Sequence, residues 1–312
     1  MTPLCQRLAL RTPIIQAGMV WNSGAKLAAA AANAGALGVI GAGSMRPELL
    51  REHLQKARAL TQGPLAVNVP LLYDKTQEQL EIALAEGIKI FITSAGSPKT
   101  YTAMLKARGA FVLHVVATPE LAAKCEAAGV DAVIAEGFEA GGHNGRDELT
   151  TMALVPQVVD RVKIPVIAAG GIADGRGIAA ALALGAQAVQ MGTRFVATVE
   201  GSGHANFKQA VVQASSTDTM LMMKRSVPVR LLKNKFFEEI KALEERGASK
   251  EELEAHLGKG RARAGMLEGD LSEGELEIGQ CVGLVKDIPT VAALVARLMQ
   301  EYSAARAALP QF

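Results

Sequence analysis

The sequence contains few of the residues that mark several common protein classes. Aromatic residues make up only 4% of the 312 positions, which argues against an all-β sandwich. The three cysteines, Cys5, Cys125 and Cys281, lie far apart and form no CxxC pair, which excludes a disulfide scaffold and an ordinary zinc cluster. We therefore expect no metal site. The 33 basic and 31 acidic residues nearly cancel, which argues against nucleic-acid binding.

Long apolar runs are also missing. The most apolar stretch, residues 27–40, is too short to span a membrane and is interrupted by Asn33 and Gly35. The N-terminal stretch contains Arg7 and Arg11 and so lacks the core of a signal peptide. These features predict a cytoplasmic protein without a membrane partner. The P-loop and the GxGxxG turn after a first strand are absent, which excludes a classical dinucleotide fold. The GxSxG elbow is absent as well.

Short runs rich in Val, Ile and Ala recur along the chain. We interpret them as strands 13–17, 37–40, 65–69, 88–93, 111–115, 132–135, 166–169 and 188–191. They do not alternate with polar residues, as expected of strands buried on both faces. Alanine-rich amphipathic stretches, such as 24–33, 76–86 and 119–128, lie between them. Eight strands alternating with helices predict an α/β fold, a (β/α)8 TIM barrel, with a doubly wound sheet as the alternative.

The strand–helix repeat fills the chain only to about residue 200. We predict a barrel made of residues 1–203 and 280–312, interrupted by an inserted helical lid of residues 204–279. Ser249 and Glu252 form a capping-box pattern that starts one of its helices. Residues 289–308 again have the pattern of a plain amphipathic helix.

Two glycine-containing pairs of residues follow the last two predicted strands, where barrels commonly bind a phosphate. Gly170-Gly171 come after the seventh strand, and Gly192-Thr193 come after the eighth. Glycines let backbone N–H groups approach phosphate oxygens, and the threonine adds a hydroxyl donor. The pattern predicts a phosphate site. The alternative is that the glycines only permit tight turns.

The loop after the sixth predicted strand carries the strongest catalytic signal. It presents His143 between glycines at the end of the barrel where such enzymes work, and imidazole suits proton transfer near neutral pH. The alternative is a histidine that only satisfies a turn. Glu136 and Glu139 could orient this histidine, hold the loop or bind solvent. The loop has no cysteine, which argues against a thiol-dependent IMP dehydrogenase type of barrel.

The other four histidines carry weaker signals. His53 and His256 lie in charged helical contexts, where we expect them to face solvent. His114 ends the fifth predicted strand and could line the pocket or form a hydrogen bond in the core. His204 opens the predicted lid and could close over the barrel mouth or cap a helix.

Several motifs, taken together, resemble one family of FMN barrels. The segments are PIIQAGM (13–19), VN (67–68), AEGFEAGGHNG (135–145), IAAGGIADG (167–175) and QMGTRF (190–195), followed by EGD (268–270) and GQ (279–280). The family comprises the nitronate monooxygenases, formerly 2-nitropropane dioxygenases, and the flavin-dependent type II enoyl-acyl carrier protein reductases. The likeness covers nearly the whole chain.

The resemblance implies bound FMN and a catalytic role for His143. The FMN phosphate would lie at Gly170, Gly171, Gly192 and Thr193, and the flavin ring across Gly18, Met19 and Asn68, near Gly141 and Gly142. Four further residues at strand ends are expected to line the same site: Ser94, Glu136, Ala169 and Met191. NADH or NADPH would be the co-substrate. The oligomeric state is open, with a homodimer as one option.

Within the family, the sequence favours reduction of trans-2-enoyl-acyl carrier protein, or the enoyl-CoA, in fatty acid biosynthesis. Residues 197–214, 217–219 and 268–271 resemble the reductase. The run from Lys224 to Lys235 has five basic residues and no acid, and could steer an acidic carrier protein or be a solvated face or hinge. The alternatives are oxidation of nitronates or nitroalkanes with O2, reduction of quinones by NAD(P)H, and a phosphate-binding barrel without redox activity.

Overall fold

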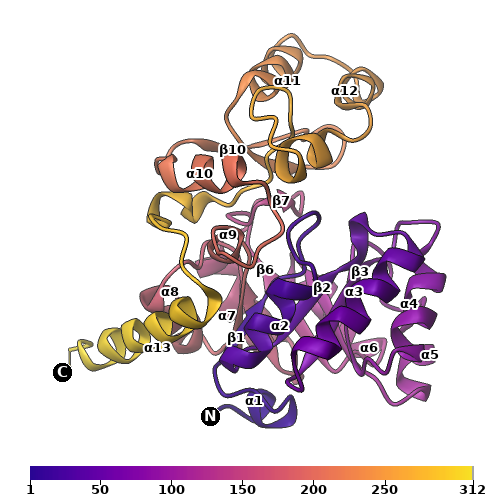
Figure 1. Ribbon diagram of the computed structural model, residues 1–312, viewed down its shortest axis with the longest axis vertical. Helices are drawn as coiled ribbons and strands as arrows, with labels where there is room; N and C mark the ends of the chain where they lie inside the picture. Colours follow the sequence, from indigo (N-terminus) through magenta and orange to yellow (C-terminus); the bar gives the residue numbers. More distant parts are fainter. Residues whose placement is uncertain (311–312) are drawn as a thin grey trace.

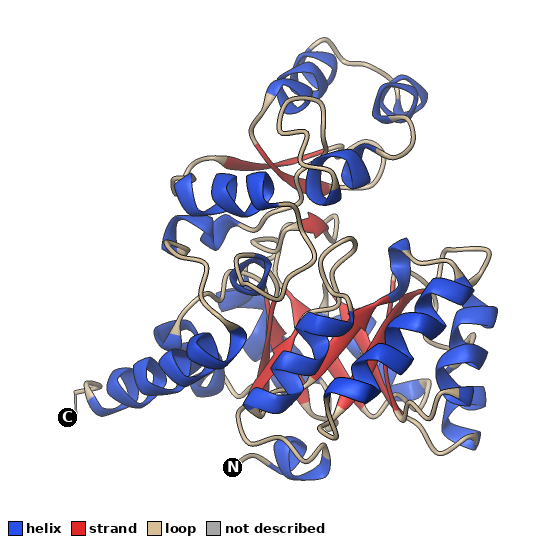
Figure 2. Cartoon of the chain, in the orientation of Figure 1, coloured by secondary structure: helices blue, strands red, loops and turns tan. Residues whose placement is uncertain are grey.

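Eight parallel strands surround a common axis in the computed structural model, which describes residues 1–310 (Figures 1 and 2). They are β1 Ile14–Gln16, β2 Gly38–Gly41, β3 Leu65–Pro70, β4 Ile90–Ser94, β5 Phe111–Val116, β6 Ala132–Glu136, β8 Val166–Ala169 and β9 Ala188–Met191. Their order is β1-β9-β8-β6-β5-β4-β3-β2, and a bridge from Ile15 to Leu37 links the two edge strands. The sheet is thus a nearly closed barrel. The TIM barrel predicted from the sequence is confirmed.

Helices cover the outside of the barrel (Figure 2). They are α2 Ala25–Ala34, α3 Pro47–Leu60, α4 Thr76–Ala85, α5 Thr102–Ala107, α6 Pro119–Ala127, α7 Thr151–Arg161, α8 Gly175–Ala183 and α13 Val291–Ala307. The short helix α9 Thr193–Val196 lies instead above the carboxyl ends of the strands (Figure 1), and a 3-10 turn at Ala42–Ser44 follows β2. Gly35 ends α2 at φ +96°, a left-handed conformation that glycine adopts without strain. None of the helices within residues 1–310 is long and apolar enough to cross a membrane.

Side chains alternate along the strands between the barrel interior and the helical layer. Ile15, Ile134 and Ile167 share the interior with α1 (Pro3–Arg7) and the residues after it, among them Leu4, Leu8 and Leu10. Their strand neighbours pack instead against α2, α7, α8 and α13. Helix α1 lies at the amino ends of the strands, so its apolar residues close that end of the barrel (Figure 1).

The inserted segment, residues 204–279, lies beyond the carboxyl ends of the strands (Figure 1). Its elements are α10 Ala205–Gln213, β10 Thr219–Met222, β11 Val229–Leu232, α11 Lys235–Glu245, α12 Lys250–Leu257 and a π-helical turn at Arg263–Leu267; a 3-10 turn at Gln280–Leu284 follows it. Ser249 and Glu252 form the expected capping box. After the insertion, α13 packs against α8 and α2, as a barrel helix should.

The inserted segment is not purely helical. Strands β10 and β11 form an antiparallel hairpin, and β11 also pairs with β7, the two-residue strand Gly142–His143 of the loop after β6. These strands were not predicted from the sequence. All three strands are short. The second partner of β11, the strand β7, lies far away in the chain, so no local sequence pattern indicates that β11 pairs with β7.

Candidate active site

Polar side chains form a layer at the carboxyl ends of the barrel strands. By the alternation described above, Asn68 of β3, Ser94 of β4, Glu136 of β6 and Gln190 of β9 continue the inward-facing rows. Asn68 Nδ2 donates a hydrogen bond to Ile92 O at 3.3 Å. The buried Gln190 Oε1 has no hydrogen-bond partner within residues 1–310. This layer therefore holds polar groups that the chain does not satisfy.

Glu136 contributes a second unpartnered group to this layer. Burial raises the pKa of its carboxyl group to about 7, and no partner among residues 1–310 offsets this. The group therefore titrates near neutral pH. Ala169 also faces the interior, whereas the Met191 side chain packs in the outer core with the helices. From Met191, only the backbone reaches the barrel mouth.

The loop after β1 lies directly against Asn68. A Cβ atom on Gly18 would come within 2.4 Å of Asn68 Cβ, so a glycine is required at that contact. Ser23 fixes the loop, because its hydroxyl accepts a hydrogen bond from Met19 N at 2.9 Å and donates one to Ala17 O at 2.7 Å. The structure thus places the loop that carries Gly18 and Met19 against Asn68, and a role of these residues in binding a ring stays a prediction.

His143 is exposed and lies on β7, which the inserted segment holds in place. Arg230 of β11 donates two hydrogen bonds to Phe138 O, at 3.0 and 2.9 Å, and its guanidinium lies over the Phe138 ring. Asn144 N donates to Pro228 O at 2.8 Å, and its side chain donates to Ala140 O and Gly142 O. The histidine loop is therefore clamped between the barrel and the hairpin.

Of the roles considered for Glu139, the contacts of its side chain favour holding the loop after β6. Its carboxylate accepts hydrogen bonds from Thr151 N at 2.9 Å and from Thr151 Oγ1 at 3.0 Å, where α7 begins. Thr151 Oγ1 also lies 2.9 Å from Gly170 O. Glu139 thus holds the loop after β6 to the loop after β8.

The glycines of the predicted phosphate site differ in what surrounds them. Gly170 has φ +95°, and a Cβ there would lie 2.6 Å from Gly137 O, so chain packing alone requires it. Gly192 has space for a Cβ, with Met19 Sδ the nearest atom at 3.4 Å. Thr193 Oγ1 accepts a hydrogen bond from Gly279 N at 2.9 Å, and its hydroxyl also faces Cys281, whose pKa it lowers.

A cavity of about 250 Å³ borders Gly171, which has φ +71°. Its lining also includes Glu139, Ser216, Gln280, Cys281, Gly283 and Leu284. Gly141 lies close by, where a Cβ would come within 2.5 Å of Gly279 N. Of the predicted phosphate residues, Gly171 therefore borders an open space where the inserted segment returns to the barrel.

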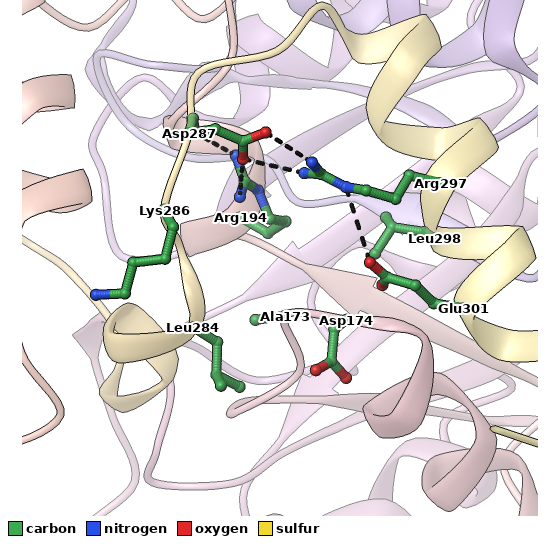
Figure 3. A pocket seen from close by; sticks show the side chains of 9 residues that line it. All are labelled: Ala173, Asp174, Arg194, Leu284, Lys286, Asp287, Arg297, Leu298 and Glu301. Carbon is green, nitrogen blue, oxygen red and sulfur yellow. Dashed lines mark hydrogen bonds and ion pairs between the residues drawn. The ribbon is translucent and has the colours of Figure 1, made fainter. Parts of the chain in front are cut away.

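A second pocket, of about 330 Å³, lies outside the barrel mouth and is held by ion pairs (Figure 3). Asp287 lies between Arg194 and Arg297, and contacts them at 3.0 Å and 2.6 Å. The Arg194 side chain is 3% exposed and also donates to Asp287 O. Because Arg194 follows Thr193 directly, these contacts fix the loop after β9 to the chain returning from the insertion.

The weaker histidine signals have structural explanations. His114 is buried with its Nδ1 2.7 Å from Thr93 Oγ1, and burial lowers its pKa to about 4, so it is a hydrogen-bonded core residue. His204 caps α10 by accepting from Asn206 N. The expectation that His53 and His256 face solvent is wrong, because His53 accepts from Ala25 N and His256 stacks on Phe236.

Four residues near the site were not found from the sequence: Tyr73, Arg230, Glu275 and Glu277. Arg230 was counted in a basic run, but it is 2% exposed and serves the histidine loop. Glu275 and Glu277 follow the EGD motif, and nothing local distinguishes them from the other acids of the insertion. Only the fold brings them to the barrel mouth.

Comparisons with known proteins agree with this architecture. The family model described as nitronate monooxygenase matches residues 2–301. The chain belongs to the nitronate monooxygenase family. Members of this family are flavin-dependent oxidoreductases, so the chain is an enzyme of that general kind.

Two solved structures are similar over nearly the full length. FabK from Thermotoga maritima is 41% identical with a TM-score of 0.94, and covers 98% of this chain and 97% of its own. A nitroalkane oxidase from Streptomyces ansochromogenes is 31% identical with a TM-score of 0.88, over 98% of this chain and 99% of its own.

Curated relatives carry two kinds of name. A Mycobacterium tuberculosis protein, 30% identical over 94% of each chain, is a hydroxy-methyl-oxo-octahydro-indene-carboxyl-CoA dehydrogenase. A probable nitronate monooxygenase from Staphylococcus haemolyticus is 37% identical over 77% of this chain and 80% of its own. The specific reaction therefore differs among relatives at similar identity.

Proposed function

We propose that this protein is an FMN-dependent reductase of trans-2-enoyl thioesters that uses NADH or NADPH. The observation that carries the proposal is the similarity to FabK, the type II enoyl-acyl carrier protein reductase, which exceeds the similarity to the nitroalkane oxidase in both identity and TM-score. The Mycobacterium relative, whose name includes a carboxyl-CoA thioester, supports the same substrate class.

The residues at the barrel mouth fit FMN. The unsatisfied Gln190 Oε1 in the inward layer offers an acceptor to a ring N–H group. The space beside Gly192 suits a phosphate, to which the Thr193 hydroxyl could turn from Cys281. The flavin ring would lie against Gly18, Met19 and Asn68, with Ser94, Glu136 and Ala169 in the same layer, and Gly141, Gly142, Gly170 and Gly171 at its edge.

Bound FMN would supply two-electron transfer to and from the substrate. His143 would hold the proton that the reduced enoyl group needs, and would donate it at the α-carbon or the thioester oxygen. Glu139 and Arg230 would position the histidine loop through Thr151 and Phe138. We assign the barrel to residues 1–203 and 280–312, of which 311–312 lie outside the described residues. We assign a covering role to residues 204–279, which would keep water from the reacting groups.

The basic run at 224–235 gives little support to docking of an acidic carrier protein. Arg230 is buried, Arg225 donates to Gly247 O, and Lys224 forms an ion pair with Glu148. Lys235 pairs with Glu273. The proposal therefore takes enoyl-acyl carrier protein and enoyl-CoA as equal candidates. A cytoplasmic location and a homodimer remain predictions.

Oxidation of nitronates with O2 is the second candidate function, because the family and the staphylococcal relatives carry that name. Anaerobic flavin reduction separates the two. We expect NADH or NADPH to bleach the flavin, and an enoyl thioester to restore its colour. Bleaching by a nitronate, with no response to either nicotinamide, would replace our proposal by the second candidate.

The cofactor assignment has its own test in Gly192→Ala. Because the chain leaves room for this methyl group, the variant should fold normally but release FMN more readily than the wild type. Flavin content and the melting temperature of the two proteins check both halves of the statement. Release of FAD instead of FMN on denaturation would contradict the assignment.

A further inference from the structure

Two carboxyl side chains of the inserted segment lie beside the histidine loop. Arg230 of β11 pairs with Gly142 and Leu231 pairs with Glu277, so Glu277 occupies the next position along the same strand edge. Glu277 Oε2 lies 2.6 Å from the point that a Cβ on Gly142 would occupy. The carboxyl group is thus packed against the residue that precedes His143.

Glu275 lies two residues earlier in the same chain segment and is 7% exposed. No hydrogen bond or ion pair to either carboxyl group occurs among residues 1–310. The pKa of both groups is raised to about 7, by burial in each case and, for Glu275, also by the charge of Glu277. His143 and Arg261 face Glu275 and act in the opposite direction.

Tyr73, on the loop after β3, lies close enough to the same two carboxyl groups for their charges to act on its phenol. Burial raises the pKa of its phenol, and the charges of Glu277 and Glu275 raise it again. Three elements therefore converge here: the loop after β3, the histidine strand β7 and the returning end of the inserted segment. Within residues 1–310, the charges of His143 and Arg261 are the ones that lower the pKa of Glu275.

We infer that Glu275 and Glu277 select substrates by charge, favouring an uncharged enoyl thioester over an anionic nitronate at His143. A negative charge in a partly dehydrated site repels an anion strongly, whereas a neutral thioester loses nothing by approaching it. This inference rests on the proposed function and names the substrate class that the site accepts.

The test compares one neutral and one anionic substrate on the FMN-loaded enzyme. The neutral substrate is the N-acetylcysteamine thioester of but-2-enoic acid, and the anion is ethyl nitronate. Variants are Glu275→Gln, Glu277→Gln and the double replacement. Glu245→Gln serves as the matched control, since it removes one exposed acid of α11, on the outer part of the inserted segment (Figure 1).

We expect kcat/KM for the nitronate to rise at least about tenfold in the double variant, with a smaller rise in each single variant. Activity on the thioester should change by less than about threefold, and the control should match the wild type. In the wild type alone, nitronate kcat/KM should fall as pH rises through about 7, because the pair then loses its proton.

A binding measurement gives a readout that does not depend on turnover. But-2-enamide and but-2-enoate have the same shape and differ in charge, and calorimetry on the oxidised holoenzyme gives their relative affinity. The double variant should gain affinity for the anion only. Unchanged selectivity in both assays overturns the inference even where NAD(P)H reduces the flavin; failure of that reduction overturns the proposed function instead.

Discussion

The two ends of the barrel are built from the same strands but treat polar groups in opposite ways. At the amino ends, Leu4, Leu8 and Leu10 close the barrel with apolar side chains, and none of the unpartnered buried side-chain atoms found within residues 1–310 lies on α1 or on the residues after it up to Leu10. At the carboxyl ends, Gln190 is buried and Glu136 is half-buried, and neither Gln190 Oε1 nor the Glu136 carboxyl group has a hydrogen-bond partner within residues 1–310. Unpaired buried polar groups destabilise a fold, so their presence at one end only marks that end as built for a ligand.

The largest effect should come from opening the apolar end. Leu10→Ala removes a side chain that is 1% exposed and leaves a cavity, which should lower the free energy of unfolding by about 2–5 kcal/mol. Turnover per folded molecule should stay at the wild-type level, because the site lies at the opposite end. Denaturant melts together with activity measured well below the transition check this. A matching loss of turnover would show that the two ends are coupled.

At the carboxyl end, His143→Ala should have the reverse profile. We expect FMN content and melting temperature to remain unchanged while turnover falls about a hundredfold, the usual scale for losing a general acid. Stopped-flow traces of each half-reaction locate the defect. His256→Ala, which alters a histidine stacked on Phe236, is the control and should retain full activity. Wild-type rates in both half-reactions of His143→Ala would make the histidine structural.

The unpartnered Glu136 should make stability depend on pH. Its folded-state pKa of about 7 lies above the ordinary carboxyl value, so its contribution is fully present below about 4.5 and is lost as pH rises through 7. Compared with Glu136→Gln, the wild type should lose about 2 kcal/mol between pH 5 and pH 8. Urea unfolding of the two proteins at both pH values measures this. Parallel pH profiles would refute the assignment.

The smallest effect concerns the clamp on the histidine loop. Arg230→Lys keeps the charge but cannot reproduce two hydrogen bonds to Phe138 O together with stacking on the ring. We expect a loss of about 1 kcal/mol in stability and a modest fall in kcat. Arg225→Lys, on the same hairpin but bonded to Gly247 O, is the matched control for kcat. An equal fall in both variants would contradict a specific role for Arg230.

The apolar end and the strands were readily predicted, since both depend on local patterns. Runs of Val, Ile and Ala identified all eight barrel strands, and Ser249 with Glu252 identified a helix start. The carboxyl end was only partly predicted. Its motif residues Gly18 and Asn68 do meet, but which role Glu139 plays depends on Thr151, a contact that no spacing announces.

The pairing of the inserted segment with the histidine loop, and the place of Glu275 and Glu277 beside it, could not be predicted for the same reason. Strand β11 pairs with β7 across more than eighty residues of sequence. The burial of Glu275 and Glu277 follows from that pairing and not from their neighbours in the chain. Glu275 and Glu277 can therefore be recognised as residues near the site only from the folded structure.

The late position of α13 has a consequence for how the protein forms during synthesis. Leu27 and Ala31 of α2, near the start of the chain, share a core with Val291 and Leu294 of α13, near its end. Synthesis must therefore pass from α2 to α13, more than 250 residues later in the sequence, before this seam of the barrel can close. Until then the apolar residues of α2 that contact α13 stay exposed. Nascent chains that end before α13 should therefore bind chaperones or aggregate.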